Sequence, residues 1–196
     1  MTNFDFALKR TFDIGASAIG LFVLCPFIAV TWVLAASDTR ESGFFRQKRV
    51  GRNGKLFTVI KLRTMRAIDG TNVTTARDKR ITPLGAKLRR YKLDELPQLW
   101  NVLCGDMSIV GPRPDVPGFM DRLCGDDREL LRLRPGITGA ASLKYHDEEE
   151  ILATVDDPER HAAEVIWPDK VRINRDYMRN WSFSGDIGYI LRTIFK

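Results

Sequence analysis

The sequence predicts an α/β fold that is mostly helical, with one small β-hairpin and an N-terminal re-entrant membrane helix. Three observations lead to this prediction. An uncharged apolar segment occupies residues 14–36, a β-rich stretch next to turn residues follows it, and most later apolar residues recur at helical spacing. The 196 residues are enough for one domain with a substantial core. We therefore expect a membrane segment at residues 1–36 and one further domain, carrying interfacial amphipathic helices, at residues 37–196.

The apolar segment reads IGASAIGLFVLCPFIAVTWVLAA and contains no charged residue. As a straight helix its roughly 23 residues would reach about 34 Å, enough to cross a bilayer core of about 30 Å. A cleaved signal peptide is the first alternative, but its apolar region would be shorter. Pro26, preceded by Cys25, lies midway along the segment. A proline there removes one helix hydrogen bond and predicts a kink.

Basic residues flank this segment on both sides, and positive residues next to membrane segments prefer the cytoplasm. Both ends are therefore expected on the same side of the membrane. A helix that enters the membrane, breaks at Pro26 and returns satisfies this condition, while a kinked span with a short outside tail remains the alternative. The flanking residues are Lys9 and Arg10 before the segment and Arg40, Arg46, Lys48, Arg49, Arg52 and Lys55 after it.

Two further stretches are typical of helices at a membrane surface. Phe4, Leu8 and Phe12 recur every four residues among charges, which predicts a short interfacial helix within residues 1–13. Near the C-terminus, Ser184 is a candidate cap for a helix with one apolar stripe. That helix can pack on the core or rest on the membrane, and both readings stay open. The stripe consists of Ile187, Ile190, Leu191 and Ile194.

The composition restricts the class of partner without choosing one. The net charge is +6 and the isoelectric point is about 9.4, which favours an anionic partner such as nucleic acid, a membrane surface or a phosphorylated ligand. The cysteines are widely spaced without a C-x-x-C pair, and the histidines match no metal spacing. We therefore expect reduced thiols and no zinc site. These residues are Cys25, Cys104, Cys124, His146 and His161.

Local turn and cap signals predict the next elements. A turn at RNG separates two strand-like runs, which predicts a hairpin of Phe44–Arg49 with Leu56–Leu62. The polar stretch AIDGTNVTTARDKR reads as a loop. Thr82 can cap a helix and Pro83 fits its first turn, so a helix is expected to begin there. The acidic stretch at residues 145–170 is expected to be partly helical, with its charges on a solvated face.

A second helix is predicted at LPQLWNVLCG, where Pro97 fits an early turn and Gly105 ends the helix. Asp94 and Glu95 then lie at or just before its N-terminus, where the helix dipole is positive. The segment MSIVGPRP reads as a short strand running into a rigid turn that presents Arg113, and RPGITG reads as a second loop of the same style. The apolar face of this helix would consist of Leu96, Leu99, Trp100 and Leu103.

Two adjacent carboxylates among many cations suit phosphate chemistry with a divalent metal. One of Asp94 and Glu95 can bind Mg²⁺, which prefers oxygen ligands, while the other attacks phosphorus and forms an acyl phosphate. A helix cap and dipole partner is the alternative role for this pair, and the surrounding cations favour the chemical role. The cations expected to bind the remaining phosphate oxygens are Lys61, Arg63, Arg89, Arg90, Arg113 and Arg134.

The stretch LDELPQLWNVLCGDMSIVGPRP strongly resembles the signature of the bacterial sugar transferase family, the small monotopic phosphoglycosyl transferases. The resemblance covers nearly the whole chain, including the proline-broken apolar segment, FFRQKRVGRNGKLFTVIKLRTM, ITPLGAKLRRYKLDELPQ and RPGITG. It implies an enzyme that initiates surface glycan or exopolysaccharide synthesis. Such an enzyme moves a phosphosugar from a UDP-sugar to polyprenol (undecaprenyl) phosphate and gives polyprenyl-diphosphate-sugar and UMP.

The resemblance also implies roles for single residues. Asp94 matches the nucleophile that forms a covalent aspartyl-phosphosugar intermediate, and Glu95 matches its metal-binding partner, with Mg²⁺ as cofactor. Arg113 matches a residue that binds substrate phosphate or nucleotide. The expected location is the bacterial inner membrane, with the catalytic domain at residues 37–196 on the cytoplasmic face.

This chain departs from the family pattern at two places. Cys25 stands where the family often has serine, so the expected kink depends more on Pro26. After RPGITG the chain continues AASLKYHDEEE instead of a Trp-Ala-Gln type sequence, so the resemblance assigns no sugar-specificity residues. It assigns neither the sugar nor the pathway, and a homodimer stays open. The chain resembles a minimal catalytic unit without the N-terminal membrane domain of larger relatives.

Two other classes of function fit parts of the sequence. A non-catalytic membrane adaptor would use the basic face, but it has no need of the Asp94–Glu95 pair. A nucleic-acid binder is suggested only by the isoelectric point, and the apolar segment and the lack of a nucleic-acid motif argue against it. The expected partners are therefore a UDP-sugar, polyprenol phosphate and inner-membrane lipids.

Overall fold

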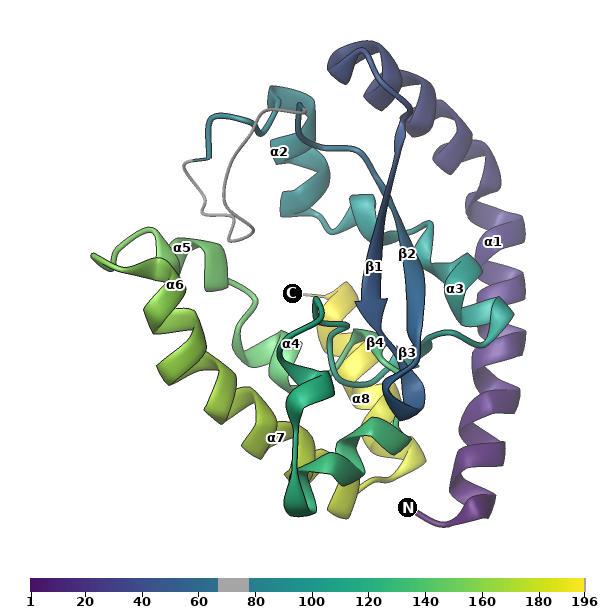
Figure 1. Ribbon diagram of the computed structural model, residues 1–196. Coiled ribbons are helices and arrows are strands. Elements are labelled where there is room, and N and C mark those ends of the chain that lie inside the picture. Colours follow the sequence, from purple (N-terminus) through teal and green to yellow (C-terminus); the bar gives the residue numbers. More distant parts are fainter. Residues whose placement is uncertain (67–77, 196) are drawn as a thin grey trace.

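The computed structural model describes residues 1–66 and 78–195, and this part of the chain is mostly helical with two small sheets (Figure 1). That composition confirms the predicted mixture of helices with a hairpin, whereas most of the loop predicted at AIDGTNVTTARDKR lies outside the described residues. The elements are α1 (Asn3–Thr39), β1 (Phe44–Val50), the 3₁₀-turn η1 (Arg52–Gly54), β2 (Leu56–Leu62), α2 (Pro83–Arg90), η2 (Leu93–Glu95), α3 (Gln98–Cys104), β3 (Ser108–Val110), η3 (Met120–Arg122), η4 (Gly125–Arg132), β4 (Gly136–Thr138), α4 (Ala140–Lys144), α5 (Glu148–Leu152), α6 (Pro158–His161), the π-turn η5 (Ala162–Ile166), α7 (Trp167–Arg179) and α8 (Phe183–Ile194).

Helix α1 runs along one edge of the molecule, the β1–β2 hairpin stands beside it, and α5, α6 and α7 form the opposite side (Figure 1). The hairpin is antiparallel and pairs Phe44 with Leu62 and Val50 with Leu56, as predicted. The main hydrophobic core joins the hairpin to β3, η4 and α7, and a smaller one lies between β2 and α3. The buried residues of the main core are Val50, Val110, Met120, Leu130, Leu131, Leu133, Val171, Tyr177 and Met178. Those of the smaller core are Phe57, Val59, Val102 and Met107.

Helix α1 is continuous from Asn3 to Thr39, so the prediction of a separate short helix within residues 1–13 is wrong. The charged and apolar stretches share one helix because no proline separates them. Pro26 lies inside the helix, which is curved rather than broken (Figure 1). One turn later, the Thr31 hydroxyl donates to the carbonyl oxygen of Phe27 at 2.8 Å. Such bonds from a hydroxyl to the preceding turn favour helix bending.

The side of α1 that packs on the domain is polar, and the outward side is apolar. Lys9, Asp13 and Ser17 are buried against the domain, while Phe22 is 84% exposed. The helix is long and apolar enough to cross a membrane, and only 11% of its most apolar stretch is buried within the molecule. A core helix of a water-soluble protein would bury such a stretch. The exposed apolar side therefore indicates association with a membrane.

Helix α2 begins as predicted, with the Thr82 hydroxyl accepting a hydrogen bond from the Gly85 N–H at 2.9 Å. Helix α3 ends at Gly105, whose φ of +92° is a left-handed conformation that glycine adopts readily. The apolar face expected on α3 is not its most buried face, because Trp100 is 53% exposed while Gln98 and Asn101 are buried. The Asn101 side chain forms hydrogen bonds with the backbone of β2, so the polar side of α3 faces the interior.

The segment RPGITG contains a strand, not only the loop that we expected. Strand β4 pairs in parallel with β3, and its backbone crosses that of the GPRP turn very closely. The Gly136 N–H donates to the Pro112 carbonyl oxygen at 2.7 Å. A Cβ at Gly136 would lie 2.1 Å from the backbone nitrogen of Gly111, so no side chain fits there. The pairing of the two motifs was not visible in the sequence because it joins distant segments.

The acidic stretch at residues 145–170 is partly helical, as expected, and forms α5, α6, η5 and the start of α7. Helix α8 is capped by Ser182, whose hydroxyl accepts from the Gly185 N–H at 3.1 Å, and not by Ser184 as expected. Ile190 packs on the core, whereas Leu191 and Ile194 near the end of α8 are exposed. The helix thus combines a packed side with an apolar exposed end.

Candidate active site

Asp94 and Glu95 lie in the single 3₁₀-turn η2 between α2 and α3, as the sequence predicted. Lys92 precedes them with a φ of +55°, a left-handed conformation that redirects the chain after α2. The turn is closed by a hydrogen bond of 3.2 Å from the Glu95 N–H to the Lys92 carbonyl oxygen. Asp94 and Glu95 retain only 7% and 5% of their accessible surface. The turn therefore holds two carboxylates inside the protein.

Helix α3 fixes this turn because it is anchored at both ends to other elements. Its Asn101 amide group donates to the Thr58 carbonyl oxygen at 2.8 Å and accepts from the Ile60 N–H at 3.1 Å, both in β2. At its C-terminus, the Arg10 guanidinium of α1 donates to the carbonyl oxygens of Val102 and Leu103. A cation at this end also complements the helix dipole. Helix α3 is thus held between β2 and α1.

Glu95 is paired with two cations from separate segments. Lys61 of β2 and Arg113, between the two prolines that follow β3, both donate to the same oxygen, Oε1, at 2.9 Å. Burial opposes the negative charge of Glu95, but Arg113 and Lys61 outweigh it and hold the pKa of this carboxyl well below its usual range. Glu95 raises the pKa of Arg113 in return. Glu95 is therefore ionised at neutral pH.

Asp94 is in a different state from its neighbour. Its Oδ1 atom is buried and has no hydrogen-bond partner in the described part of the chain. Burial, and then the charge of Glu95, raise the pKa of the Asp94 carboxyl, while Lys61 and Arg89 act against this rise. A free, buried carboxylate oxygen of raised basicity, next to cations, is suited to attack an electrophile.

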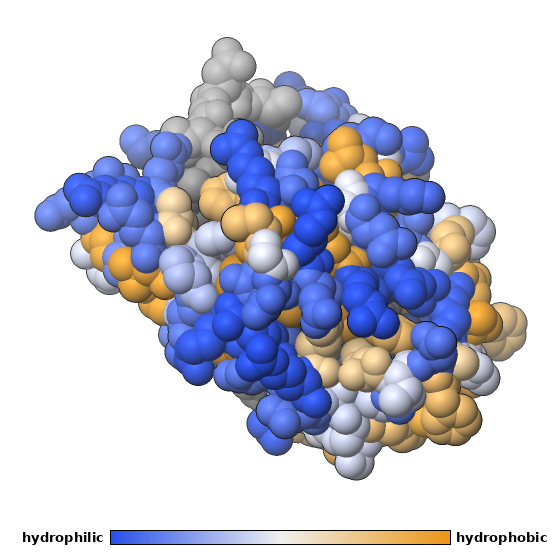
Figure 2. Space-filling model, turned by 60° about the horizontal axis from the view of Figure 1, so that its bottom comes forward, coloured by the Kyte–Doolittle hydropathy of each residue, from blue (hydrophilic) through white to orange (hydrophobic). Residues whose placement is uncertain are grey.

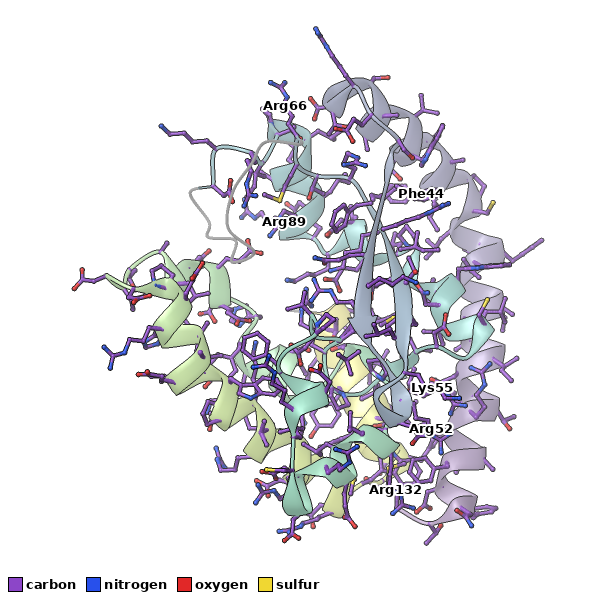
Figure 3. The ribbon with its side chains drawn as sticks, viewed as in Figure 1. Phe44, Arg52, Lys55, Arg66, Arg89 and Arg132 are labelled. Carbon is purple, nitrogen blue, oxygen red and sulfur yellow. The ribbon has the colours of Figure 1, made fainter. Side chains whose placement is uncertain are left out.

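The other predicted cations divide into those near this turn and those elsewhere. Arg89 lies on the side of α2 that faces α5 (Figure 3) and forms an ion pair with Glu149. Arg90 lies over the Tyr91 ring. Arg63 pairs with Glu41 at 3.0 Å, beside the start of β1. The structure thus places Arg89 within electrostatic reach of Asp94 and puts Arg63 in a different contact.

Arg134 is also separate from the two carboxylates. Its Nε donates to the Gly105 carbonyl oxygen at 2.8 Å, at the far end of α3. Burial, and then Arg52 and Arg10, lower the pKa of the Arg134 guanidinium. Lys61 and Arg113 are therefore the predicted cations that contact the carboxylate pair directly.

Two residues near the site were missed by the sequence reasoning. Gln98 is buried one helical turn after Asp94, and its Nε2 has no partner among the described residues. Asp115 directly follows the Pro-Arg-Pro turn, where burial raises its pKa to about 6 against the opposing charges of Lys170 and Arg49. Gln98 lies off the predicted apolar face of α3 and left no signal in the sequence, whereas Asp115 could have been found as a carboxylate next to the predicted Arg113.

The carboxylate pair fits a magnesium ion that shares its ligands with a substrate. The described residues contain no group of three His, Cys, Asp or Glu side chains that could hold a metal. Mg²⁺ is commonly held by one or two carboxylates together with substrate phosphates and water. Asp94 Oδ1 is a free buried oxygen, and the hydrogen bonds to Glu95 described above use only its Oε1. Asp94 and Glu95 could therefore hold Mg²⁺ once a phosphate is present.

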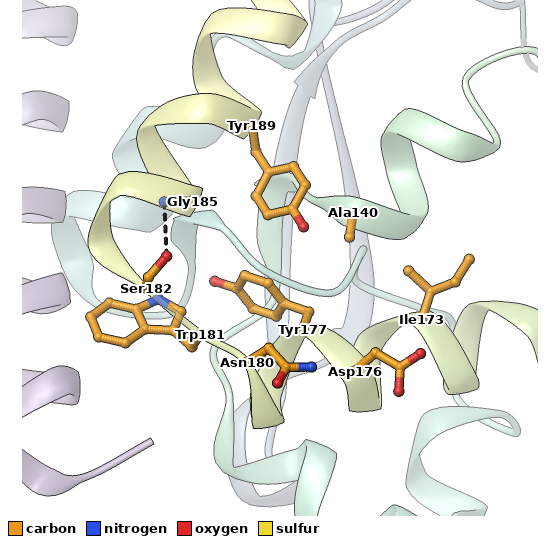
Figure 4. A pocket seen from close by; sticks show the side chains of 9 residues that line it. All are labelled: Ala140, Ile173, Asp176, Tyr177, Asn180, Trp181, Ser182, Gly185 and Tyr189. Carbon is orange, nitrogen blue, oxygen red and sulfur yellow. Dashed lines mark hydrogen bonds between the residues drawn. The ribbon is translucent and has the colours of Figure 1, made fainter.

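A separate cavity lies elsewhere, between α4, α7 and α8 (Figure 4). Its volume is about 260 Å³, and Tyr177, Trp181 and Tyr189 line it. The polar groups of Tyr177 and Trp181 are already bonded to Asp186, at 2.8 and 3.0 Å. This cavity contains neither Asp94 nor Glu95, so the candidate site rests on the carboxylate turn.

Comparison with known proteins gives a consistent set of relatives. Undecaprenyl-phosphate galactose phosphotransferase of Salmonella typhimurium is 34% identical, and the match covers 95% of this chain and 39% of that protein. Undecaprenyl-phosphate glucose phosphotransferase of Komagataeibacter xylinus is 36% identical over 99% of this chain and 36% of its own length. Exopolysaccharide production protein ExoY of Rhizobium meliloti is 30% identical over 95% of this chain and 83% of its length.

The chain thus spans less than half the length of the first two of these relatives, and most of the third. The bacterial sugar transferase family matches residues 4–196, which include all of α1 after Asn3, the carboxylate turn and the Pro-Arg-Pro turn. The resemblance noted in the sequence therefore extends from α1 to the end of the chain, and the protein belongs to the bacterial sugar transferase family.

Proposed function

We propose that this chain is a membrane-bound phosphoglycosyl transferase that moves a phosphosugar from a UDP-sugar to undecaprenyl phosphate and releases UMP. The observation that carries the proposal is the buried Asp94, with a free Oδ1 atom, beside a Glu95 that two cations keep ionised. The names of the relatives support the substrate class, since they specify undecaprenyl phosphate with galactose or glucose. Such a product begins the synthesis of a surface glycan or exopolysaccharide.

Asp94 provides the nucleophile. A carboxylate oxygen of Asp94 attacks the phosphorus that bears the sugar, and a bond from this phosphorus to the bridging oxygen breaks. UMP leaves with that oxygen and its electron pair, and an aspartyl-phosphosugar remains. An oxygen of undecaprenyl phosphate then attacks the same phosphorus, which returns Asp94 as a carboxylate and forms the diphosphate product. Neither displacement needs a proton from the protein.

The neighbouring cations position the phosphates. Arg113 and Lys61 converge on one oxygen of Glu95, so their remaining N–H groups can bind phosphate oxygens beside Asp94. The prolines on both sides of Arg113 restrict its backbone, so little conformational entropy is lost on binding. Bound Mg²⁺ would reduce the negative charge of the diphosphate that Asp94 approaches. Glu95 holds these cations at the site and offers a ligand oxygen.

We propose further that α1 enters and leaves the membrane by its cytoplasmic face. Contacts with the same domain at both ends of the helix support this topology. Near its start, Asp13 accepts a hydrogen bond of 3.0 Å from the Ile109 N–H; near its end, the Trp32 ring lies 6.1 Å from that of Phe44. A helix that crossed the bilayer could not keep both contacts with a domain on one side, because the bilayer core is about 30 Å thick. Basic residues at both ends also favour one side.

Trapping of the intermediate tests the proposed chemistry. The full chain is incubated with a UDP-sugar labelled on the sugar-bearing phosphate, first without and then with undecaprenyl phosphate. We expect label to join the protein in the first step and to move to the lipid in the second. Asp94→Asn should give neither event, while Asp156→Asn, an exposed control on the acidic stretch, should give both. Normal turnover by Asp94→Asn, with deamidation excluded, would mean direct attack by the lipid phosphate.

A further inference from the structure

Four arginines gather at the turn end of the hairpin, away from the carboxylate turn. We call Arg10, Arg52, Arg132 and Arg134 the basic cluster. They come from α1, η1, the end of η4 and the segment before β4, respectively. Arg52 and Arg132 lie near the lower end of the hairpin in Figure 3, whereas Arg89 lies near its upper end. The basic cluster is therefore distinct from the cations around Glu95.

Structural contacts account for only part of this cluster. Arg10 and Arg134 donate to carbonyl oxygens at the end of α3. Arg52 and Arg132 contact the Phe6 ring instead, with guanidinium carbons 5.3 and 5.8 Å from its centre. The Nε of Arg52 is buried without a hydrogen-bond partner among the described residues. A buried guanidinium donor without a partner is costly, so an oxygen ligand would stabilise it.

The basic cluster also lacks compensating negative charge. Within the described ranges, none of its four guanidiniums forms an ion pair with a carboxylate, although Asp13 acts on Arg134 from a distance. Asp13 itself accepts a hydrogen bond from the Ile109 N–H. Because arginine keeps its proton, the repulsion within the cluster is relieved only by an anion.

The location of the cluster indicates which anion is available. Phe6 and Arg10 lie on α1 about 12 and 6 Å, respectively, along the axis before Ile14, where the uncharged apolar stretch of the helix begins. Exposed Phe4 lies on the same end of the helix. Seen from this end, hydrophilic surface borders the apolar surface at the edge where α1 runs (Figure 2). Phosphates of lipid headgroups lie at this level of a membrane.

We propose that Arg52 and Arg132, supported by Arg10 and Arg134, bind the headgroup phosphate of an anionic phospholipid at the N-terminal end of α1. The planar guanidinium offers paired N–H groups that match two phosphate oxygens. The inference rests on the proposed membrane placement of α1, but not on the chemistry at Asp94. Such a site would fix the height and rotation of the catalytic domain relative to the bilayer.

Native mass spectrometry of the detergent-solubilised full chain tests this site. The chain is titrated with phosphatidylglycerol or phosphatidylcholine of the same acyl length, and bound lipids are counted. We expect the wild type to prefer phosphatidylglycerol. The double variant Arg52→Gln/Arg132→Gln should bind it about thirtyfold more weakly, since each of the two cations near an anionic headgroup contributes about 1 kcal/mol. An unchanged preference in the double variant would overturn the proposal.

Matched variants separate this site from general charge and folding effects. Arg160→Gln/Arg172→Gln removes the same charge from exposed positions on α6 and α7 and should keep the wild-type preference. An equal loss in this control would overturn a specific site. Arg132→Gln alone changes an exposed side chain, so it should fold normally and still weaken phosphatidylglycerol binding. Melting temperatures verify folding of each variant.

Two further measurements distinguish the ligand source and the proposed function. Inorganic phosphate is titrated in the same detergent; tight binding of free phosphate, lost in the double variant, would assign the site to a soluble phosphate and overturn the lipid ligand. UMP release is measured in parallel. A chain that prefers phosphatidylglycerol through the cluster but has no turnover would retain the lipid site and lose the proposed enzyme function.

Discussion

Asp94 and Glu95 are neighbours in the chain, but their carboxylates lie in opposite electrostatic surroundings. Lys61 and Arg113 hold the pKa of Glu95 well below its usual range despite burial, whereas burial and the charge of Glu95 raise that of Asp94. Environments that separate the pKa values of two acids commonly assign them different roles. Here Glu95 stays ionised and organises the cations, while Asp94 keeps a free oxygen.

Replacing Glu95 by Gln should lower both turnover and the response to magnesium. The amide keeps an oxygen for Lys61 and Arg113 but removes the charge that balances them. We expect a fall of about a hundredfold in kcat and a loss of stability of about 1–3 kcal/mol, a value reduced from that of a fully buried pair because Arg113 is partly exposed. UMP release over a Mg²⁺ titration and thermal unfolding measure the two effects. Wild-type magnesium dependence in the variant would exclude Glu95 as a ligand.

Arg113→Lys should reduce kcat/KM by about tenfold or more, which corresponds to at least about 1.4 kcal/mol of transition-state binding. Lysine keeps the charge but loses the planar pair of N–H groups that fits a phosphate. The exposed Arg160→Lys on α6 is the matched control. If kcat/KM is unchanged in Arg113→Lys, the residue serves only to hold Glu95 in place.

The ion pair between Arg89 and Glu149 predicts competition between α5 and the substrate. Arg89 lies within electrostatic reach of Asp94, but its guanidinium is occupied by Glu149. Glu149→Gln should free Arg89 for a substrate phosphate and lower KM for the UDP-sugar by about threefold, because a partly exposed pair contributes under about 1 kcal/mol. Glu150→Gln removes an exposed neighbouring charge and should leave KM unchanged. A higher KM in Glu149→Gln would instead make this pair part of the binding site.

Asp115 predicts a specific dependence of stability on pH. Its folded pKa of about 6 exceeds the ordinary value of 3.8, so the folded state holds more protons between these values. The contribution of Asp115 to the free energy of unfolding is fully present below pH 3.8 and is lost as the pH rises through 6. Asp115→Asn should remove this loss and raise stability at pH 7 by about 1–3 kcal/mol relative to wild type. Thermal unfolding from pH 4.5 to 7.5 tests this, with the exposed Asp126→Asn as control; parallel curves for wild type and Asp115→Asn would contradict it.

The topology proposed for α1 predicts the accessibility of its N-terminus. In an active background without other cysteines, a single cysteine at position 2 or 3 should resist a membrane-impermeant maleimide in intact cells and react after lysis. Pro26→Ala should straighten the helix and increase labelling from outside. Labelling of the unmodified helix from outside, with the catalytic domain still protected, would establish a true span.

Local signals predicted much of this fold correctly. The hairpin follows from a turn between two strand-like runs, and the start of α2 follows from Thr82 and Pro83. The apolar stripe of α3 was misleading because Asn101 bonds the edge of β2, which makes a polar side chain the inward one. The strand at RPGITG was missed since its partner, β3, lies more than twenty residues earlier in the chain. Pairing between distant segments leaves little trace in one local pattern.

The sequence also predicts only part of the candidate site. It identifies Asp94 and Glu95 because they are adjacent carboxylates, and Arg113 because it lies between two prolines. Composition alone does not tell which cations reach the carboxylates, so the sequence predicts the same role for Arg63, Arg134 and Lys61, although Arg63 and Arg134 bind elsewhere. Gln98 was hidden because the sequence does not reveal that its side chain is buried near the carboxylate turn without a partner.

The polar side of α1 packs against the domain, so the helix is part of the fold as well as a membrane anchor. Lys9 reaches the buried Asp186, which also holds Tyr177 and Trp181. A chain cut after the helix would leave this carboxylate without its cation, at a cost of about 3–5 kcal/mol. An unrelated membrane helix fused in its place would supply hydrophobicity but not this lysine. Insertion into the bilayer and folding of the domain are therefore expected to be one cooperative event.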